Sequence, residues 1–293
     1  MDNDKVLLTN IRPARFSSYW YQDNKQLLAK EIKEATLHAK EDEGEERSEP
    51  TLMILPHSGL TYSKRAFSYL LTRHKSIIKA AIILSPCHYA PFVPNTLYKS
   101  NFDGYDTPLG TLPSLSLKLN HPTIGDNFPF LSEHGVEMIL PILAYKQEEQ
   151  QQELKVSMFL INHLDSKEKT KHLTVAFLHA IKALPYSLDE IVVIASSDFT
   201  HYGKRFQHTP FDGSNEDVGN LIKNADMKVI EELINGDHTK ESVFPSTPCG
   251  YAAMSIVSEM ASILSLKGQL VEYYTSQDIM KSDDSVSYAS IFF

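Results

Sequence analysis

Three histidines follow apolar, strand-like segments of this chain. His57 follows residues 51–55, His88 follows residues 80–84, and His201 follows residues 191–196. Short continuous apolar runs are typical of strands buried on both faces, as in a parallel sheet. Ligands of an open α/β sheet bind just outside the carboxyl ends of its strands. If the three strands run parallel, the histidines gather at one edge of the sheet, which predicts a metal-binding or catalytic pocket there.

Two further residues add chemistry to these turns. Cys249 precedes a predicted helix, whose dipole favours the thiolate form of a cysteine at its start. Asp198 lies three residues before His201, a spacing that places a carboxylate beside an imidazole on a turn. Imidazole and thiolate bind zinc, iron and copper better than they bind hard cations. Two histidines with a cysteine or a carboxylate also leave coordination positions open for water or substrate.

The segment Glu133-His134-Gly-Val-Glu137 supplies another imidazole and two more acids. On a helix, His134 and Glu137 are one turn apart and face together. Two interpretations stay open. The pair supports the pocket, or it belongs to a solvated helix start with acids near its positive end.

Composition and motifs exclude several other classes. The 293 residues are 42% hydrophobic and carry a formal net charge of −9, which argues against nucleic acid and anionic membranes as partners. No apolar run approaches the roughly 18 residues of a membrane span, and no signal peptide is recognisable, so we expect a cytoplasmic protein. A disulfide between the two cysteines, Cys87 and Cys249, is not expected in that compartment. The serine-hydrolase elbow, glycine-rich nucleotide loops and paired Cys-x-x-Cys are missing from the sequence.

Alternating strand and helix patterns predict a single α/β/α domain over residues 1–293, with a central, largely parallel mixed sheet. We expect strands at 51–55, 80–84, 156–161, 191–196, 269–274 and 286–293. We expect helices at 22–40, 63–73, 133–145, 167–184, 216–234 and 251–267, the third ended or kinked by Pro141. Residues 95–132 are predicted to form short strands and loops. Residues 40–50 and 146–153 are predicted to be an acidic solvated loop and a polar surface connection.

The order and spacing of these motifs resemble the Memo family. The segments that carry the resemblance are Pro56-His57-Ser58-Gly59, Pro86-Cys87-His88, Glu133-His134-Gly-Val-Glu137, Ser196-Ser197-Asp198-Phe199-Thr200-His201, and Cys249-Gly250. The opening Arg12–Tyr21 and the ending Asp284–Ala289 also fit, so the resemblance covers nearly the whole chain. It implies a fold shared with the class III extradiol (non-haem iron) dioxygenases.

The resemblance also implies roles for individual residues. The implied metal ligands are His57, His88 and Cys249. Asp198 and His201 line the same pocket, with His201 as the acid–base group. His134 and Glu137 are implied as supporting residues.

Memo-like proteins are linked to copper- or iron-dependent redox chemistry, cell motility and receptor tyrosine kinase signalling. The resemblance therefore implies a metal-binding protein with redox or oxygen-dependent activity, in the cytoplasm or also in the nucleus. One alternative is a non-enzymatic signalling module that binds a signalling protein or a phosphopeptide. The family's Gly-Pro-Ser-His-His reads Ser85-Pro86-Cys87-His88-Tyr89 here, a change that favours this alternative. A zinc-dependent hydrolase, with His201 or Asp198 as the base, is a third interpretation.

Overall fold

The structure is a computed structural model that describes residues 10–41, 49–211, 213, 215–237 and 243–293. Most of the predicted acidic loop at 40–50 lies outside these residues. A nine-stranded sheet runs in the order β10-β12-β2-β9-β3-β8-β4-β7, with β11 paired to β12. Its strands are β2 (Leu52–Leu55), β3 (Ala80–Ser85), β4 (Leu97–Lys99), β7 (Thr123–Gly125), β8 (Lys155–Leu160), β9 (Ile191–Ser196), β10 (His201–Tyr202), β11 (Gln269–Thr275) and β12 (Ser285–Phe292).

The four central strands β2, β9, β3 and β8 are mutually parallel. β4 and β12 join this core antiparallel to it, so the sheet is mixed. Every residue of β2, β3 and β9 is buried, which is the reason these segments read as continuous apolar runs. Since the three strands run in one direction, their carboxyl ends meet at one edge, as the sequence predicts.

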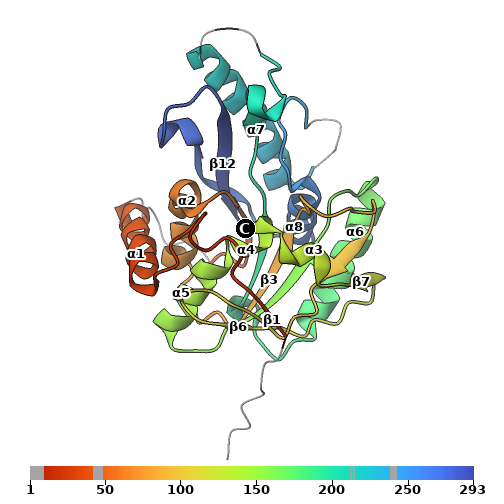
Figure 1. Ribbon diagram of the computed structural model, residues 1–293. Helices are drawn as coiled ribbons and strands as arrows, with labels where there is room; N and C mark the ends of the chain where they lie inside the picture. Colours follow the sequence, from red (N-terminus) through yellow and green to blue (C-terminus); the bar gives the residue numbers. More distant parts are fainter. Residues whose placement is uncertain (1–9, 42–48, 212, 214, 238–242) are drawn as a thin grey trace, which may run out of the picture.

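Helices cover both faces of this sheet (Figure 1). Alternate strand residues point to opposite faces: Met53 and Ile83 pack towards one helical layer, and Ile54 and Ile82 towards the other. The first layer contains α1 (Lys25–Glu41), α2 (Leu60–Arg73) and α5 (Leu140–Gln150). The second contains α6 (Lys167–Lys182), α7 (Asn215–Asn235) and α8 (Tyr251–Ile263). This three-layer α/β/α arrangement confirms the predicted fold class.

Residues 95–132 form short strands and loops, as expected. A small sheet in the order β1-β5-β6 joins the N-terminal segment to this region. Its strands are β1 (Ile11–Arg12), β5 (Gly104–Tyr105) and β6 (Leu112–Pro113), and the short helix α3 (Phe128–Leu131) follows. Among the described helices, none is long and apolar enough to cross a membrane.

Three sequence-based expectations about helices need correction. The predicted helix over 133–145 is two helices, α4 (His134–Glu137) and α5, and Pro141 lies in the first turn of α5. Proline fits there because the first helical N–H groups have no intrahelical partner. The predicted polar connection over 146–153 lies largely at the surface, as expected, but α5 continues through it to Gln150. Lys146 is buried, with Nζ donating to the carbonyl of His74. α8 ends at Ile263, before the predicted Lys267.

Candidate metal centre

The turn after β2 carries His57 and is held by a carboxylate from the neighbouring strand β9. The backbone N–H of His57 donates to Asp198 Oδ1 at 2.8 Å, and Ser58 Oγ donates to Asp198 Oδ2 at 2.7 Å. Asp198 is buried, and it lies two residues beyond the end of β9. The adjacency of β2 and β9 in the sheet is what brings this carboxylate to the turn.

The hydrogen bonds of His57 assign its tautomer. Ser196 Oγ donates to the carbonyl of Gly135 at 2.5 Å, so it accepts from His57 Nδ1, which lies 3.0 Å away. The proton is thereby assigned to Nδ1, and Nε2 keeps its lone pair. Burial lowers the pKa of His57 well below its usual value, and the nearby His88 and His201 lower it further. The ring is therefore neutral, as a metal ligand requires.

His88, on the turn after β3, is oriented by Glu133. Its Nδ1 donates to Glu133 Oε1 at 2.8 Å, and its backbone N–H donates to Glu133 Oε2 at 2.6 Å. Burial acts to raise the pKa of Glu133, but the hydrogen bonds and charge of His88 outweigh it and the net shift is downward. A carboxylate on Nδ1 leaves Nε2 of His88 as the available ligand atom, an arrangement common at metal sites.

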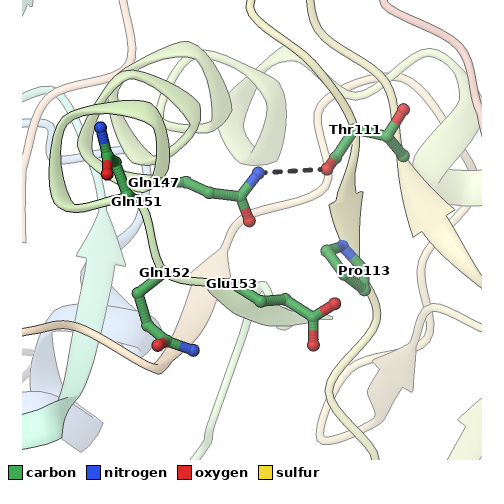
Figure 2. A pocket seen from close by; sticks show the side chains of 6 residues that line it. All are labelled: Thr111, Pro113, Gln147, Gln151, Gln152 and Glu153. Atoms are coloured by element: carbon green, nitrogen blue, oxygen red, sulfur yellow. Dashed lines mark hydrogen bonds between the residues drawn. The ribbon is translucent and has the colours of Figure 1, made fainter. Parts of the chain in front are cut away.

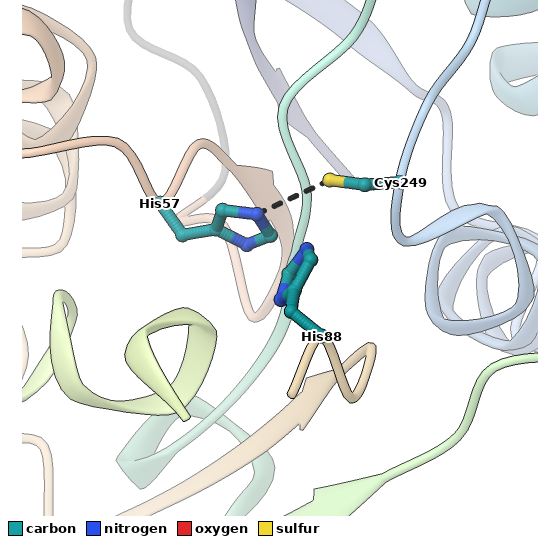
Figure 3. Close-up of side chains that lie close together, drawn as sticks. All are labelled: His57, His88 and Cys249. Carbon is teal, nitrogen blue, oxygen red and sulfur yellow. Dashed lines mark hydrogen bonds between the residues drawn. The ribbon is translucent and has the colours of Figure 1, made fainter. Parts of the chain in front are cut away.

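Cys249 completes a group of three ligands (Figure 3). Its Sγ lies 3.1 Å from His57 Nε2, so the thiol proton is shared with the lone pair of the imidazole. One ligand atom from each of His57, His88 and Cys249 lies within 4.8 Å of the other two. The three side chains reach this point from the turns after β2 and β3 and from the segment before α8. The structure thus brings together the three residues predicted as metal ligands.

The expectation that the dipole of the following helix favours the thiolate is wrong for Cys249 in the metal-free protein. Burial raises the pKa of the Cys249 thiol to about 12, and the carboxylate of Asp198 adds to the rise. Cys249 also precedes Gly250, the N-cap of α8, and so lies outside the first turn. A metal ion would have to displace this proton. Both cysteines are free, and the sulfur of Cys87 contacts the carbonyl of Ala90 instead of the pocket.

His134 lies in the pocket with the two ligand histidines. Its ring centroid lies 4.4 Å from that of His88 and 5.0 Å from that of His57. Burial lowers the pKa of His134 to about 3, so the ring is neutral. Its Nδ1, 3.4 Å from Glu133 Oε1, therefore makes no ion pair. Aromatic rings surround it: Trp20 at 4.6 Å and Tyr89 at 5.4 Å between centroids.

Glu137, the second residue predicted to support the pocket, lies outside it. Glu137 does not face the pocket with His134: it forms a buried ion pair with Arg12 and accepts from the backbone N–H of Phe16 and from Tyr21 Oη. It anchors the N-terminal segment that carries the aromatic rings. The acid that supports the pocket is Glu133, a role that the sequence reasoning did not assign.

Asp198 and His201 do not form the predicted carboxylate–imidazole pair in the described contacts. The carboxylate of Asp198 is used by the His57 turn, and His201 Nδ1 lies 3.0 Å from the carbonyl of Phe199. His201 still lies close enough to His57 to lower the pKa of that ring. Its acid–base role stays a prediction.

A separate surface hollow lies between the end of α5 and β6 (Figure 2). It is lined by Thr111, Pro113, Gln147, Gln151, Gln152 and Glu153. Gln147 Nε2 spans it by donating to the carbonyl of Thr111 at 3.3 Å. Its lining has one carboxylate and neither histidine nor cysteine, so it does not share the chemistry of the histidine pocket.

Fold and site together define an α/β protein with two histidines and a cysteine gathered at the carboxyl edge of its sheet. A protein-family model described as "Memo-like protein" matches residues 12–292. The chain therefore belongs to the Memo family.

Named relatives match over most of their length. A MEMO1 family protein of Pyrococcus furiosus is 27% identical, covering 96% of this chain and 98% of that protein. Protein MEMO1 of Xenopus tropicalis is 26% identical, covering 95% and 96%. A solved structure of an uncharacterized Escherichia coli protein covers 82% of this chain and 98% of its own, at 14% identity and a TM-score of 0.41. That similarity is too low to extend the family match.

Proposed function

We propose that this Memo-family chain binds one iron or copper ion through His57 Nε2, His88 Nε2 and Cys249 Sγ. The observation that carries the proposal is the convergence of one ligand atom from each residue within 4.8 Å. The donor set fits the ion, because imidazole and thiolate ligands suit copper, iron or zinc. Both imidazoles are also held at Nδ1, by Ser196 and Glu133, so that Nε2 is presented.

The surroundings of the three ligands support a site at which a bound metal ion can react with small molecules. His88 is exposed, which gives solvent and small molecules access to the ligand group. Three protein ligands leave coordination positions open. A bound iron or copper ion supplies one-electron redox and oxygen chemistry. We assign proton transfer in such a reaction to His201, with Asp198 holding the His57 turn in place.

Cobalt substitution tests the ligand set directly. Adding Co²⁺ to the metal-free protein is expected to produce a thiolate-to-cobalt absorption band at one equivalent. Cys249→Ser should lose the band and His88→Ala should weaken binding strongly. Cys87→Ser is the matched control, since it changes the other cysteine and should keep the band. A band that survives Cys249→Ser would contradict the proposal.

A second candidate function is the binding of a signalling protein or phosphopeptide, with or without metal. The aromatic rings of Phe16, Trp20 and Tyr89 beside His134 favour it, because they offer apolar contact surface at the pocket. Direct titration with tyrosine-phosphorylated peptides tests it. Binding that is lost in Trp20→Ala but unaffected by His88→Ala would favour a binding module over a metal enzyme.

A third candidate function is a zinc-dependent hydrolase that uses the same three ligands. A panel of ester, amide and phosphate substrates with zinc-loaded protein tests it.

The location is also part of the proposal. The two free thiols are typical of a reducing compartment and support a cytoplasmic location.

A further inference from the structure

Asp226, on α7, is a buried carboxylate that no part of the site described above uses. It is fully buried. Its Oδ1 accepts from Thr200 Oγ1 at 2.6 Å and from Ser246 Oγ at 2.5 Å, and its Oδ2 accepts from Tyr273 Oη at 2.8 Å. These hydrogen bonds offset part of the cost of burying a carboxylate, while burial still raises the pKa of Asp226 above its usual value. The question is why this part of the fold needs such a group.

The two hydroxyls on Oδ1 come from the segments that carry site residues. Thr200 lies between Asp198 and His201, and Ser246 lies three residues before Cys249. Asp226 thus binds the turn after β9 and the segment before α8 at one oxygen atom. Tyr273 lies on β11, a strand that carries none of the site residues, and donates to the other oxygen, Oδ2.

Direct contacts continue from this point towards the thiol. The backbone N–H of His201 donates to Thr247 Oγ1 at 3.0 Å. Further along, the backbone N–H of Cys249 donates to the carbonyl of Asp198 at 3.3 Å. The two segments therefore run side by side from Asp226 to the pocket, and Asp226 fixes the end that lies away from the metal ligands.

A carboxylate suits this position because it only accepts hydrogen bonds. Thr200 and Ser246 must both turn their protons towards it, although their oxygens lie 3.2 Å apart. Both hydroxyls meet at the one oxygen Oδ1, so an amide in the same place could keep its oxygen there and turn its N–H₂ group towards Tyr273 Oη, which can accept. Removal of the whole carboxylate, as in Asp226→Ala, takes away the shared acceptor that aligns the two segments.

We propose that Asp226 is a positioning residue that holds the Cys249 segment against the Asp198–His201 turn and thereby sets the place of Cys249 Sγ beside His57 Nε2. Its consequence for metal affinity rests on the proposed function. The placement of the thiol does not, because it is defined by the 3.1 Å contact between Cys249 Sγ and His57 Nε2 within the protein itself.

The test compares Asp226→Ala, which removes the shared acceptor, with Tyr273→Phe, which removes a hydrogen bond from the same carboxylate on the side away from the site. Co²⁺ affinity, the thiolate–cobalt band and stability in urea are measured for both. Asp226→Ala is expected to bind Co²⁺ at least about tenfold more weakly, with a shifted or weakened band. Tyr273→Phe should lose stability but keep the affinity and the band of the parent protein.

A second readout needs no metal. In a Cys87→Ala background, the rate at which iodoacetamide alkylates Cys249 should change severalfold in Asp226→Ala and stay unchanged in Tyr273→Phe. Ser246→Ala, which frees the Cys249 segment from Asp226, gives the same test if Asp226→Ala does not fold. Parent-like affinity and alkylation in Asp226→Ala or Ser246→Ala, or equal changes in Tyr273→Phe, would overturn the inference. If the parent protein binds no Co²⁺, the proposed function fails, and alkylation alone decides the role of Asp226.

Discussion

Glu133 and Glu137 lie four positions apart at the two ends of α4, yet the structure gives them separate tasks. Glu133 receives Nδ1 and the backbone N–H of His88, whereas Glu137 pairs with Arg12 in the interior. The sequence predicts an acid near His134 but not which one faces the pocket. A weak signal was present, because Glu133 immediately precedes the short helix and its side chain caps it by accepting from Gly135 N–H.

The two acids make a matched pair of variants. Glu133→Gln removes the charge that orients His88 and places an N–H₂ group near a backbone donor, so metal affinity should fall by about 10- to 100-fold. Glu137→Gln leaves Arg12 buried without its counter-charge, which should cost about 3–5 kcal/mol of unfolding free energy. Competition titrations and urea unfolding measure both effects. Equal losses of affinity in the two variants would show that Glu133 has no special part in orienting His88.

The convergence of His57, His88 and Cys249 was predictable because each lies beside an element with a strong local signal, and the family resemblance joined the three as candidate ligands. His57 and His88 follow continuous apolar strands, and Cys249 precedes a helix with a Pro-Cys-Gly start. The acidity of the Cys249 thiol was not predictable. It depends on burial and on Asp198, which reaches the site from another strand.

At the scale of elements, α4 packs closely against the end of β3 at Gly135. A Cβ at this position would overlap Ser85 Oγ and lie 3.2 Å from His57 Nδ1. The side chain of Ser85 fills space that Gly135 leaves open. The approach of α4 to β3 places Glu133 and His134 in the pocket.

We therefore expect Gly135→Ala to lower the free energy of unfolding by about 1–3 kcal/mol. Ser85→Gly should cost about 0.5–1 kcal/mol by itself, since glycine weakens a strand. The double variant should be more stable than the sum of the two losses implies, because the overlap is relieved. Urea unfolding of the four proteins gives the coupling energy. Simple additivity would mean that α4 shifts to accommodate the methyl group.

The elements with strong periodic or apolar patterns were predicted nearly to their ends, and the errors lie where long-range contacts decide. The stretch from Lys146 looks like a polar loop, but α5 continues there because Lys146 Nζ reaches the carbonyl of His74, distant in sequence. Asp226 is a similar case, since its hydroxyl partners come from three other segments. No local pattern identifies such partners.

For the whole molecule, two buried neutral histidines make stability depend on pH. The folded-state pKa values of His57 and His134 lie below the ordinary value of 6.5, that of His134 at about 3. Their contribution is therefore complete above pH 6.5 and is lost as the pH falls below it, because the unfolded chain then binds protons that the folded protein does not.

Between pH 6.5 and 4.5, metal-free protein should lose up to about 1.4 kcal/mol of unfolding free energy per pH unit for each of these histidines. His134→Gln should reduce the slope by one such increment. His172→Gln is the control, since the side chain of His172 is 71% exposed, and it should leave the slope as it is. Urea unfolding at several pH values provides the measurement. An unchanged slope in His134→Gln would mean that this ring is protonated in the folded protein.

The overall architecture and the family follow from the sequence, since buried parallel strands and ordered motifs are visible there, and the α/β/α layers and the Memo-family match confirm both. The single domain over residues 1–293 stays a prediction. The metal, its chemistry and the acid–base role of His201 also stay predictions, because they depend on what occupies the pocket.

The most direct test of the central claim is the metal content of protein purified anaerobically without chelator, determined by elemental analysis beside His88→Ala, Cys249→Ala and Cys87→Ala. The account predicts about one equivalent of iron or copper in the parent protein and in Cys87→Ala, and its loss in the other two variants. A parent protein that holds no transition metal and is not stabilised by added iron, copper or zinc would contradict the account.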